Sequence, residues 1–458
     1  MFEFSGHRMD VNGRLSRRCL LRAGVMGLTG LSLVDLARAA PGQSPAADDL
    51  SVILVWLDGG PPQHETYDPK PQTPAEIRGP YGAMRTRVPG IAVSEMLPCH
   101  ALVMDKMSII RSVRHTLDVN FGDHFTAEHV TLTGYNGGVR DGRTAPVNPS
   151  FGSVVAKLKG ARQRGVPPYV GLPEMHTSNI FPGYHSATYL GSAYDPFVAN
   201  GDPNSPTYRP PNLSLPDEIS LARLENRRAL RAEFDRFRRS GDSHRATDRV
   251  DPLWQNAFSL LTSPGIRTAF EVGREDPKTR DRYGRHEWGQ SALIARRLVE
   301  AGVRFVTLTF SQGPIQWDVH TSLEPRLAPM LPPFDRAVAM LIADLDERGL
   351  LDSTMVIVMG EFGRAPKLST GGDDPIPGRD HWIKLMSVLV AGGGVPRGQV
   401  IGSSSSKGEE PKDRPVAPQD LLVTVYHKLG IDPATTFRDS LGRPISIGSD
   451  GTVIPELC

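Results

Sequence analysis

The chain has 458 residues, a formal net charge of +1, 22% charged residues and three cysteines. This length allows about two to three domains. A charge so close to zero gives no basic surface that would point to nucleic acid or to an anionic membrane, so neither is an expected partner. Three cysteines are too few for a disulfide scaffold.

The first forty residues have the layout of a twin-arginine export signal. Paired arginines in residues 16–21 (SRRCLL) precede an apolar run over residues 23–36, and an A-x-A cleavage site follows at residues 37–39. The apolar run is shorter than the roughly 20 residues that span a bilayer, so no stable membrane span is expected. A cytoplasmic amphipathic helix is the alternative interpretation. We expect residues 1–39 to be a signal peptide and the protein to be periplasmic or extracellular.

Removal of this segment changes the chain only modestly. It leaves 458 − 39 = 419 residues, enough for a large core. The segment carries six arginines and three acidic residues, so the mature charge is about +1 − 3 = −2. Only Cys99 and Cys458 remain, and one disulfide between them is possible.

The rest of the chain alternates apolar runs with amphipathic stretches. Near-continuous apolar runs predict buried strands at residues 51–57, 107–110, 303–310, 354–359 and 385–390. Helical spacing of apolar residues predicts helices at residues 290–301, 334–348 and 419–429. This alternation predicts an α/β fold of three layers, in which helices flank a central, mainly parallel sheet.

Two regions depart from this alternation. Residues 194–216 are rich in proline, asparagine and aspartate, and helices are predicted after them at residues 222–239 and 252–261. Residues 403–413 (SSSSKGEEPKD) are expected to be a flexible loop. We therefore expect one domain over residues 50–458, with a mostly helical, loop-rich insertion around residues 194–285.

Acidic residues and histidines follow several predicted strands. Sites in open α/β sheets form at the carboxyl ends of strands, and the residues found there are Asp58, Asp318, His320, Glu361, Asp380 and His381. Each has an ordinary explanation when taken alone, because Asp-Gly-Gly is commonly a turn and Asp-x-His is a weak motif. Their coincidence favours a metal site. Carboxylate with imidazole suits zinc, manganese or iron, whereas carboxylate alone suits calcium or magnesium.

The segment 123–134 (DHFTAEHVTLTG) holds two more histidines. Positions five apart on a helix diverge by about 140°, so His124 and His129 cannot easily bind one ion together. His124 begins the segment and is better placed to point into a site. His129 is expected on the surface or in the core.

Several motifs in order resemble one bacterial family. They are VWLDGGPPQHETYDPKP, MSIIRSVRH, ARRLVEAGVRFVTLTF with WDVHTS, MGEFGRAPK with GRDHW, and VLVAGGGVPRGQVIG. Together with the export signal, they resemble domain of unknown function 1501 (DUF1501), a family similar to the alkaline phosphatase and sulfatase superfamily. The resemblance implies a central mixed sheet with metals at the strand ends.

The resemblance also implies roles for particular residues. Asp58 matches the superfamily's first metal-ligand aspartate, Asp318 and His320 its second ligand pair, and His381 its late histidine ligand. Glu361 takes an aspartate position, and Phe362 stands where the superfamily has a histidine. Counting back from Thr133 and Gly134 places His124 where phosphatases carry Ser or Thr and sulfatases a modified Cys. His124 would then be a metal ligand or a nucleophile of the phosphohistidine type.

These assignments support two functional hypotheses. The first is an exported hydrolase of phosphate or sulfate esters that needs a divalent metal: zinc, calcium, magnesium or manganese. Its substrate would be an anionic small-molecule or glycan ester. His124 would act at the ester, and Arg111 and Arg364 would bind its anionic group. Surface ion pairs are the alternative for both arginines. The second is a non-catalytic scaffold that binds sulfated or phosphorylated glycans. In the first strand-end loop, Glu65 is a candidate for the edge of the site, whereas His64 and Asp68 are expected to be turn and surface residues.

Overall fold

The computed structural model describes residues 47–116, 122–135, 147–175, 184–209, 264–311, 316–370 and 374–458. Residues Ala46–Cys458 form one compact unit. The predicted export signal and the predicted helices at 222–239 and 252–261 lie outside the described residues, as does part of the expected insertion. In the described part, no helix is both long and apolar enough to cross a membrane.

The centre of this unit is an eight-stranded sheet in the order β12-β4-β11-β8-β1-β7-β5-β6. Strand β11 runs antiparallel to both of its neighbours, and the other pairs are parallel. The strands are β1 (Ser51–Trp56), β4 (Met107–Val113), β5 (Tyr169–Leu172), β6 (Phe197–Val198), β7 (Phe305–Thr309), β8 (Thr354–Met359), β11 (Met386–Ala391) and β12 (Gln399–Ile401). The prediction of a mainly parallel central sheet is confirmed.

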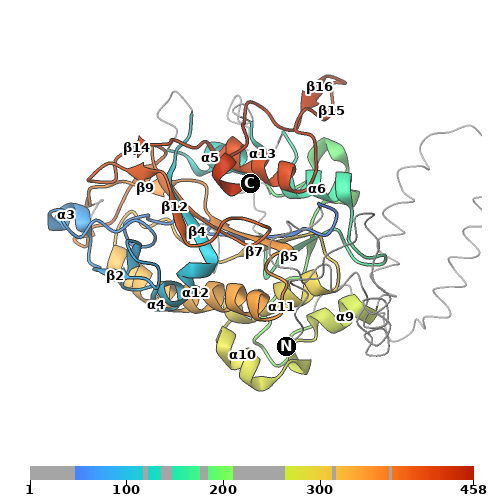
Figure 1. The fold of residues 1–458 in the computed structure, drawn as a ribbon, viewed down its shortest axis with the longest axis horizontal. Coiled ribbons are helices and arrows are strands. Elements are labelled where there is room, and N and C mark those ends of the chain that lie inside the picture. The colour runs from blue at the N-terminus through green and yellow to red at the C-terminus, as the bar shows by residue number, and fades with distance from the viewer. Residues whose placement is uncertain are drawn as a thin grey trace, which may run out of the picture. The chain divides into compact units, whose positions relative to one another are not determined.

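Each face of the sheet is covered by helices, because successive side chains of a strand point to opposite faces. In β1, Ile53 and Val55 belong to one hydrophobic core and Val52 and Leu54 to the other. The first core is closed by α4 (Pro98–Val103), α11 (Glu287–Glu300) and α12 (Leu323–Glu347), which lie below the sheet in Figure 1. The second is closed by α6 (Phe151–Lys159) and α13 (Pro418–Lys428), with α5 (His124–Thr133) beside α13 on the same side.

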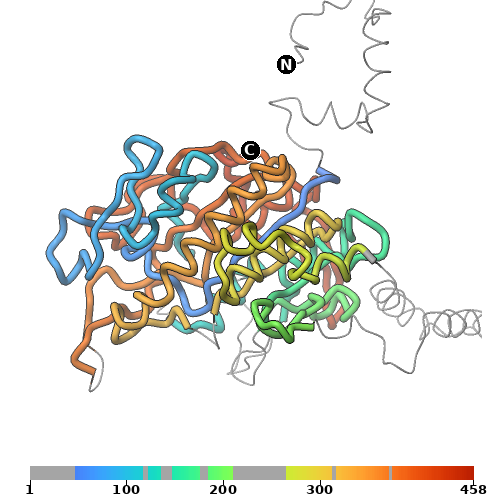
Figure 2. The backbone as a smooth tube through the Cα atoms, turned by 90° about the horizontal axis from the view of Figure 1, so that it is seen from below, coloured from blue at the N-terminus to red at the C-terminus, as the bar shows by residue number. Residues whose placement is uncertain are grey.

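Figure 2 views the molecule from the side of α11 and α12, with their yellow and orange segments in front. The described ends of the expected insertion contribute β6 and two short helices, α9 (Pro264–Phe270) and α10 (Pro277–Tyr283), and both helices pack on α11.

The predicted strands, and the predicted helices at 290–301, 334–348 and 419–429, are confirmed, but two expectations about regular structure are wrong. Helix α12 begins at Leu323 and not at residue 334, because it tolerates Pro329, Pro332 and Pro333 inside it. Because proline removes intrahelical hydrogen bonds, the sequence pattern predicts a start of the helix that is too late. Residues 403–413 are not simply a loop, since Ser403–Ser404 (β13) pairs with Pro411–Asp413 (β14) as a hairpin.

The topology brings strand ends together at one edge of the sheet. Strands β7, β1 and β8 are adjacent and parallel, so the residues that follow them emerge side by side. Beyond β8, the two-residue strand β9 (Gly363–Arg364) pairs with β10 (His381–Trp382), which returns the chain to the same edge. Asp58, Asp318, Glu361 and His381 are thereby placed near one another although up to 323 positions separate them in sequence.

Candidate metal centre

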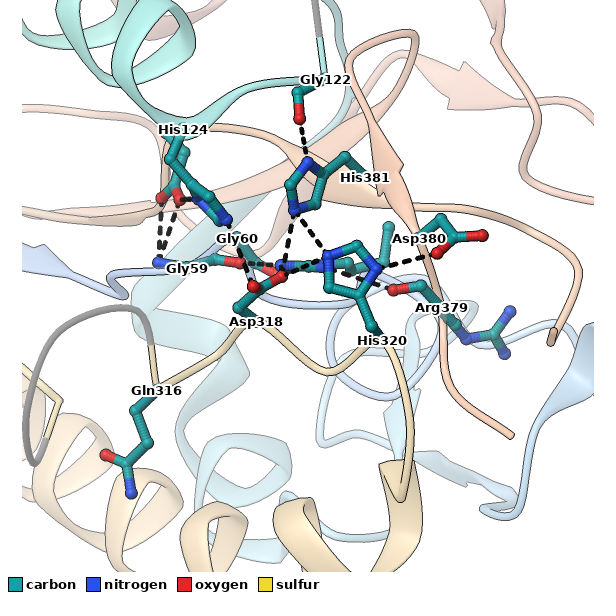
Figure 3. Close-up of polar contacts among 12 residues, drawn as sticks. Gly59, Gly60, Gly122, His124, Gln316, Asp318, His320, Arg379, Asp380 and His381 are labelled. Atoms are coloured by element: carbon teal, nitrogen blue, oxygen red, sulfur yellow. Dashed lines mark hydrogen bonds and ion pairs between the residues drawn. The ribbon is translucent and has the colours of Figure 1, made fainter. Parts of the chain in front are cut away.

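Three of the predicted site residues meet where the segment after β7 reaches the start of β10. His320 Nε2 lies 2.9 Å from His381 Nε2, and Asp318 Oδ1 lies 3.0 Å from the first nitrogen and 3.1 Å from the second. Figure 3 shows the two imidazole rings facing each other beside this carboxylate. Three polar atoms therefore face one common point.

His124 adds a fourth side chain from the first turn of α5. The helix begins here because Asp123 caps it, accepting a hydrogen bond from the backbone N–H of Thr126 at 2.8 Å. His124 Nε2 is buried, makes no hydrogen bond and lies 3.4 Å from Asp318 Oδ2. Potential ligand atoms of His124, Asp318 and His381 all lie within 4.8 Å of one another.

The other ring nitrogen of each histidine is held by an oxygen. Nδ1 of His124 contacts Glu361 Oε1 at 2.6 Å, Nδ1 of His320 contacts Asp380 Oδ1 at 2.8 Å, and Nδ1 of His381 contacts the carbonyl oxygen of Gly122. Carboxylate and carbonyl oxygens accept hydrogen bonds, so each Nδ1 carries the proton. In the neutral imidazole, each Nε2 then presents a lone pair toward Asp318. Metal-binding histidines have this arrangement, with the second nitrogen bonded to a carboxylate or carbonyl.

These atoms fit a small divalent ion. Zinc–nitrogen bonds of about 2.0–2.1 Å place tetrahedral ligand atoms about 3.3 Å apart, close to the 2.9–3.1 Å separations among Asp318, His320 and His381. The unbonded, buried Nε2 of His124 supplies a further donor. Three imidazoles with one carboxylate suit zinc or manganese better than calcium or magnesium, which prefer oxygen ligands.

Proton affinities in this cluster reflect the same contacts. Burial alone would raise the pKa of Asp318, but its interactions with the three facing histidines and with the charge of Arg364 bring it far below its ordinary value. Burial alone would lower the pKa of His124, yet its interactions with the carboxylates of Asp318 and Glu361 raise it to about 9. Without a metal, His124 is protonated at neutral pH. A cation, either a proton or a metal, is therefore favoured here.

Arg364 holds Asp318 in place. It is fully buried, and its guanidinium lies 2.5 Å from Asp318 Oδ1 and donates to the backbone carbonyl oxygens of Gly59, Gly60 and Arg379. The guanidinium makes all four of these contacts within the protein, and no part of the Arg364 side chain is exposed to solvent. We therefore expect Arg364 to position Asp318 and not to bind an anionic ligand as the sequence suggested.

A buried ion pair supports the β9–β10 turn. Arg379 contacts both oxygens of Glu65 at 2.7–3.1 Å, and both side chains are fully buried. Because Arg379 immediately precedes Asp380 and His381, Glu65 acts on the cluster through the backbone. Glu65 therefore pairs with Arg379 and is not among the facing ligand atoms.

Asp58 and Glu361 border the cluster on its acidic side. The carboxylate of Glu361 accepts hydrogen bonds from the backbone N–H of Gly59 at 3.0 and 3.2 Å, besides contacting His124. Asp58 is nearly buried, and its backbone carbonyl accepts from the N–H of Trp317 at 3.0 Å. The predicted role of Asp58 as a metal ligand is not tested by these contacts.

Glu128 is a nearby residue that the sequence reasoning missed. Burial, and then the charges of Asp58 and Glu361, raise the pKa of Glu128 well above its ordinary value. The three carboxyl groups are thus electrostatic neighbours. The signal was available, since Glu128 lies four residues after His124 on α5 and residues i and i+4 share a helix face.

Two other predicted residues have structural partners outside the cluster. Arg111 donates to the backbone carbonyls of Tyr67 and Ala92, at 2.9 and 2.6 Å, so we expect it to fix these loops. His129 is buried, and its Nδ1 contacts the carbonyl of Tyr135 at 3.1 Å.

His64 and Asp68 are buried, so their expected placement on the surface is wrong. His64 Nε2 contacts the carbonyl of Lys407 at 2.9 Å, and Asp68 pairs with Lys70 at 2.9 Å. The hairpin segment 403–413 covers them, because Ser404 also donates to Asp68.

The Phe362 ring packs against two histidines of the cluster. Its centroid lies 5.1 Å from that of His124 and 4.6 Å from that of His381. It also explains Gly60, which adopts φ +77°, since a Cβ there would lie 2.6 Å from the Phe362 ring. One side of the cluster is therefore apolar.

Sequence comparison identifies the family of this chain. A profile of the family described as "Protein of unknown function (DUF1501)" matches residues 49–458. The chain belongs to this family. This match confirms the family that the sequence motifs predict. A search of curated protein sequences finds no match.

Several solved structures are similar to the DUF1501 chain at low identity. Lipoteichoic acid synthase LtaP from Listeria monocytogenes is 12% identical, with a TM-score of 0.36 over 91% of this chain and 80% of that chain. PsFucS1 sulfatase from Pseudoalteromonas sp. is 12% identical, with a TM-score of 0.36 over 91% and 72%. Alkaline phosphatase from the Antarctic bacterium TAB5 is 16% identical, with a TM-score of 0.34 over 83% and 96%.

Proposed function

We propose that the protein is an exported, metal-dependent hydrolase of phosphate or sulfate esters. The observation that carries the proposal is the convergence of three imidazole Nε2 atoms on the Asp318 carboxylate, each fixed from behind by an oxygen at Nδ1. His124, Asp318, His320 and His381 would hold one zinc or manganese ion. Glu361 and Asp380 would orient two of these histidines and not bind the ion themselves.

The bound ion would polarise an ester oxygen and lower the pKa of a water molecule. The chain's own residues prepare this chemistry. Arg364 restrains Asp318, while Glu361 holds the Nδ1 proton of His124 and so directs its Nε2 toward the metal position. In this assignment His124 completes the ligand set, so the attacking group is water and not His124.

Hydrolysis assays with metal-supplemented protein test the proposal. Aryl phosphate and aryl sulfate esters serve as generic substrates, and His381→Ala removes one proposed ligand. His427→Ala is the matched control, because His427 lies on the exposed side of α13. Activity that survives chelation and is equal in the two variants contradicts the proposal.

A non-catalytic scaffold that binds anionic glycans is the second candidate function. Phe362 favours it, because this ring occupies one side of the cluster and leaves a single compact ligand set. Saturable binding of a sulfated polysaccharide without turnover of either ester class distinguishes this function from hydrolysis.

Export rests on the twin-arginine pattern of residues 16–39. Fractionation of a producing cell tests it. We expect mature protein outside the cytoplasm, and replacement of Arg17 and Arg18 by lysine is expected to retain the precursor inside.

A further inference from the structure

The loop that follows β1 holds Arg364, the residue that restrains the proposed metal ligand Asp318. The carbonyl oxygens of Gly59 and Gly60 accept hydrogen bonds from the Arg364 guanidinium. The same guanidinium lies 2.5 Å from Asp318 Oδ1. Because the side chain starts from the Arg364 backbone, whatever fixes that backbone also affects Asp318.

The side chain of Gln63, in the same loop, contacts the Arg364 backbone at two points. Gln63 Nε2 donates to the carbonyl oxygen of Arg364 at 2.7 Å, and Gln63 Oε1 accepts from the N–H of Arg364 at 2.9 Å. Gln63 is only 1% exposed. A side-chain amide has a donor and an acceptor at its end, as a peptide unit does. Gln63 thus pairs with Arg364 as a neighbouring strand would.

This contact lies on the edge of β9 that faces away from β10. The N–H of Ala365 donates to the carbonyl oxygen of Asp380 at 2.8 Å, toward β10. In an antiparallel pair, the backbone groups of successive residues point to opposite edges, so the N–H and C=O of Arg364 face the other side. Gln63 therefore satisfies two buried backbone groups that β10 does not pair with.

The sequence around this contact explains why a side chain takes the part of a strand. Pro61 and Pro62 precede Gln63 and have no backbone N–H to donate. Gly363 leaves room for the amide, because a Cβ at Gly363 would lie 2.5 Å from Gln63 Oε1. The carbonyl oxygen of Gln63 accepts from the N–H of Asp68 at 2.8 Å. The Gln63 amide is therefore held in one place beside β9.

The two short strands β9 and β10 carry two groups of the metal centre. Arg364 on β9 restrains Asp318, and His381, which pairs with Arg364 in the strand register, supplies a facing nitrogen. An isolated two-stranded pair is only marginally stable. The Gln63 contact on the free edge of β9 therefore fixes both groups.

We propose that Gln63 is a positioning residue of the metal centre. It fixes the backbone of β9 and thereby keeps Arg364 on Asp318 and keeps His381 in its place on β10. Gln63 acts through Arg364 and not by binding the ion or the ester itself. This role rests on the proposed metal-dependent function, because it concerns the geometry of the ion's ligands.

Substitution with cobalt(II) tests this role, since the visible spectrum of the bound ion reports the geometry of its ligands. Gln63→Met keeps the length of the side chain and removes both hydrogen bonds. Gln63→Asn keeps the amide but is one methylene shorter, so it is the smaller perturbation. Gln290→Met is the matched control, because Gln290 is also fully buried and donates to the carbonyl oxygens of Arg280 and Gly284 at 3.0 and 2.8 Å. Circular dichroism checks that each variant is folded.

Competition with a chromogenic chelator measures the affinity of each chain for the ion. In Gln63→Met, this affinity is expected to fall about tenfold, the lower end of the range for a partner behind a metal ligand. The visible bands of bound cobalt(II) are expected to change as well, and Gln63→Asn is expected to change in the same direction. Gln290→Met is expected to keep the affinity and the spectrum of the unmodified chain.

The outcomes separate this role from the function on which it rests. Unchanged affinity and spectrum in the folded Gln63 variants overturn the positioning role and leave the metal-dependent function standing. Loss of the fold in both Gln63 variants also overturns it, because Gln63 would then be needed by the whole domain. An unmodified chain that takes up no divalent ion contradicts the proposed function itself, and this role with it.

Discussion

Removing the carboxylate behind His124 is expected to weaken metal binding more than removing the one behind His320. Glu361 is 1% exposed, contacts His124 Nδ1 at 2.6 Å and is itself held by the N–H of Gly59. Asp380 contacts His320 Nδ1 at 2.8 Å, but its side chain is 61% exposed. Water can replace an exposed partner and cannot easily replace a buried one.

The loss of an oxygen partner behind a ligating histidine costs about 10–100-fold in metal affinity. We assign the upper part of this range, about 100-fold, to Glu361→Gln and the lower part, about tenfold, to Asp380→Asn. Competition with a chromogenic chelator measures both affinities, and circular dichroism checks that each variant is folded. Equal affinities in the two folded variants, or a larger loss in Asp380→Asn, would refute this reasoning.

Two further predictions concern protons and a buried charge. The pKa of His124 is about 9 in the metal-free protein, so metal binding at neutral pH is expected to release a proton and to become tighter as the pH rises toward 9. Calorimetry in buffers of different ionisation enthalpy measures this release. A binding enthalpy that does not depend on the buffer would contradict the prediction. Glu65→Gln leaves the fully buried Arg379 without its counter-ion, so it is expected to lower the free energy of unfolding by about 3–5 kcal/mol. Asp281→Asn, which breaks the exposed pair with Arg285, is the control and is expected to cost under about 1 kcal/mol in the same urea titration.

The sequence predicted those parts of the fold that depend on local pattern. Strands β1 and β8 are buried on both faces, so their apolar runs were unmistakable. Strands β5 and β12 were missed because they have only four and three residues. The start of α12 was missed because three prolines argue locally against a helix, whereas packing of its apolar face against the sheet stabilises it.

The cluster was predicted as a set of residues but not as a geometry. Parallel strand ends share an edge, which is why Asp318, His320 and His381 could be grouped from the sequence. Which nitrogen of each imidazole faces inward depends on oxygens such as the carbonyl of Gly122, and nothing in the sequence specifies such a partner. The same holds for Arg364, whose charge suggested a ligand-binding role until its burial was known.

The metal content of gently purified protein tests the central claim most directly. Elemental analysis is expected to find about one equivalent of zinc or manganese in the unmodified chain and in His427→Ala. It is expected to find much less in His381→Ala, which lacks one of the facing nitrogens. Protein that holds no divalent ion and takes none up when supplied with zinc or manganese would contradict the account.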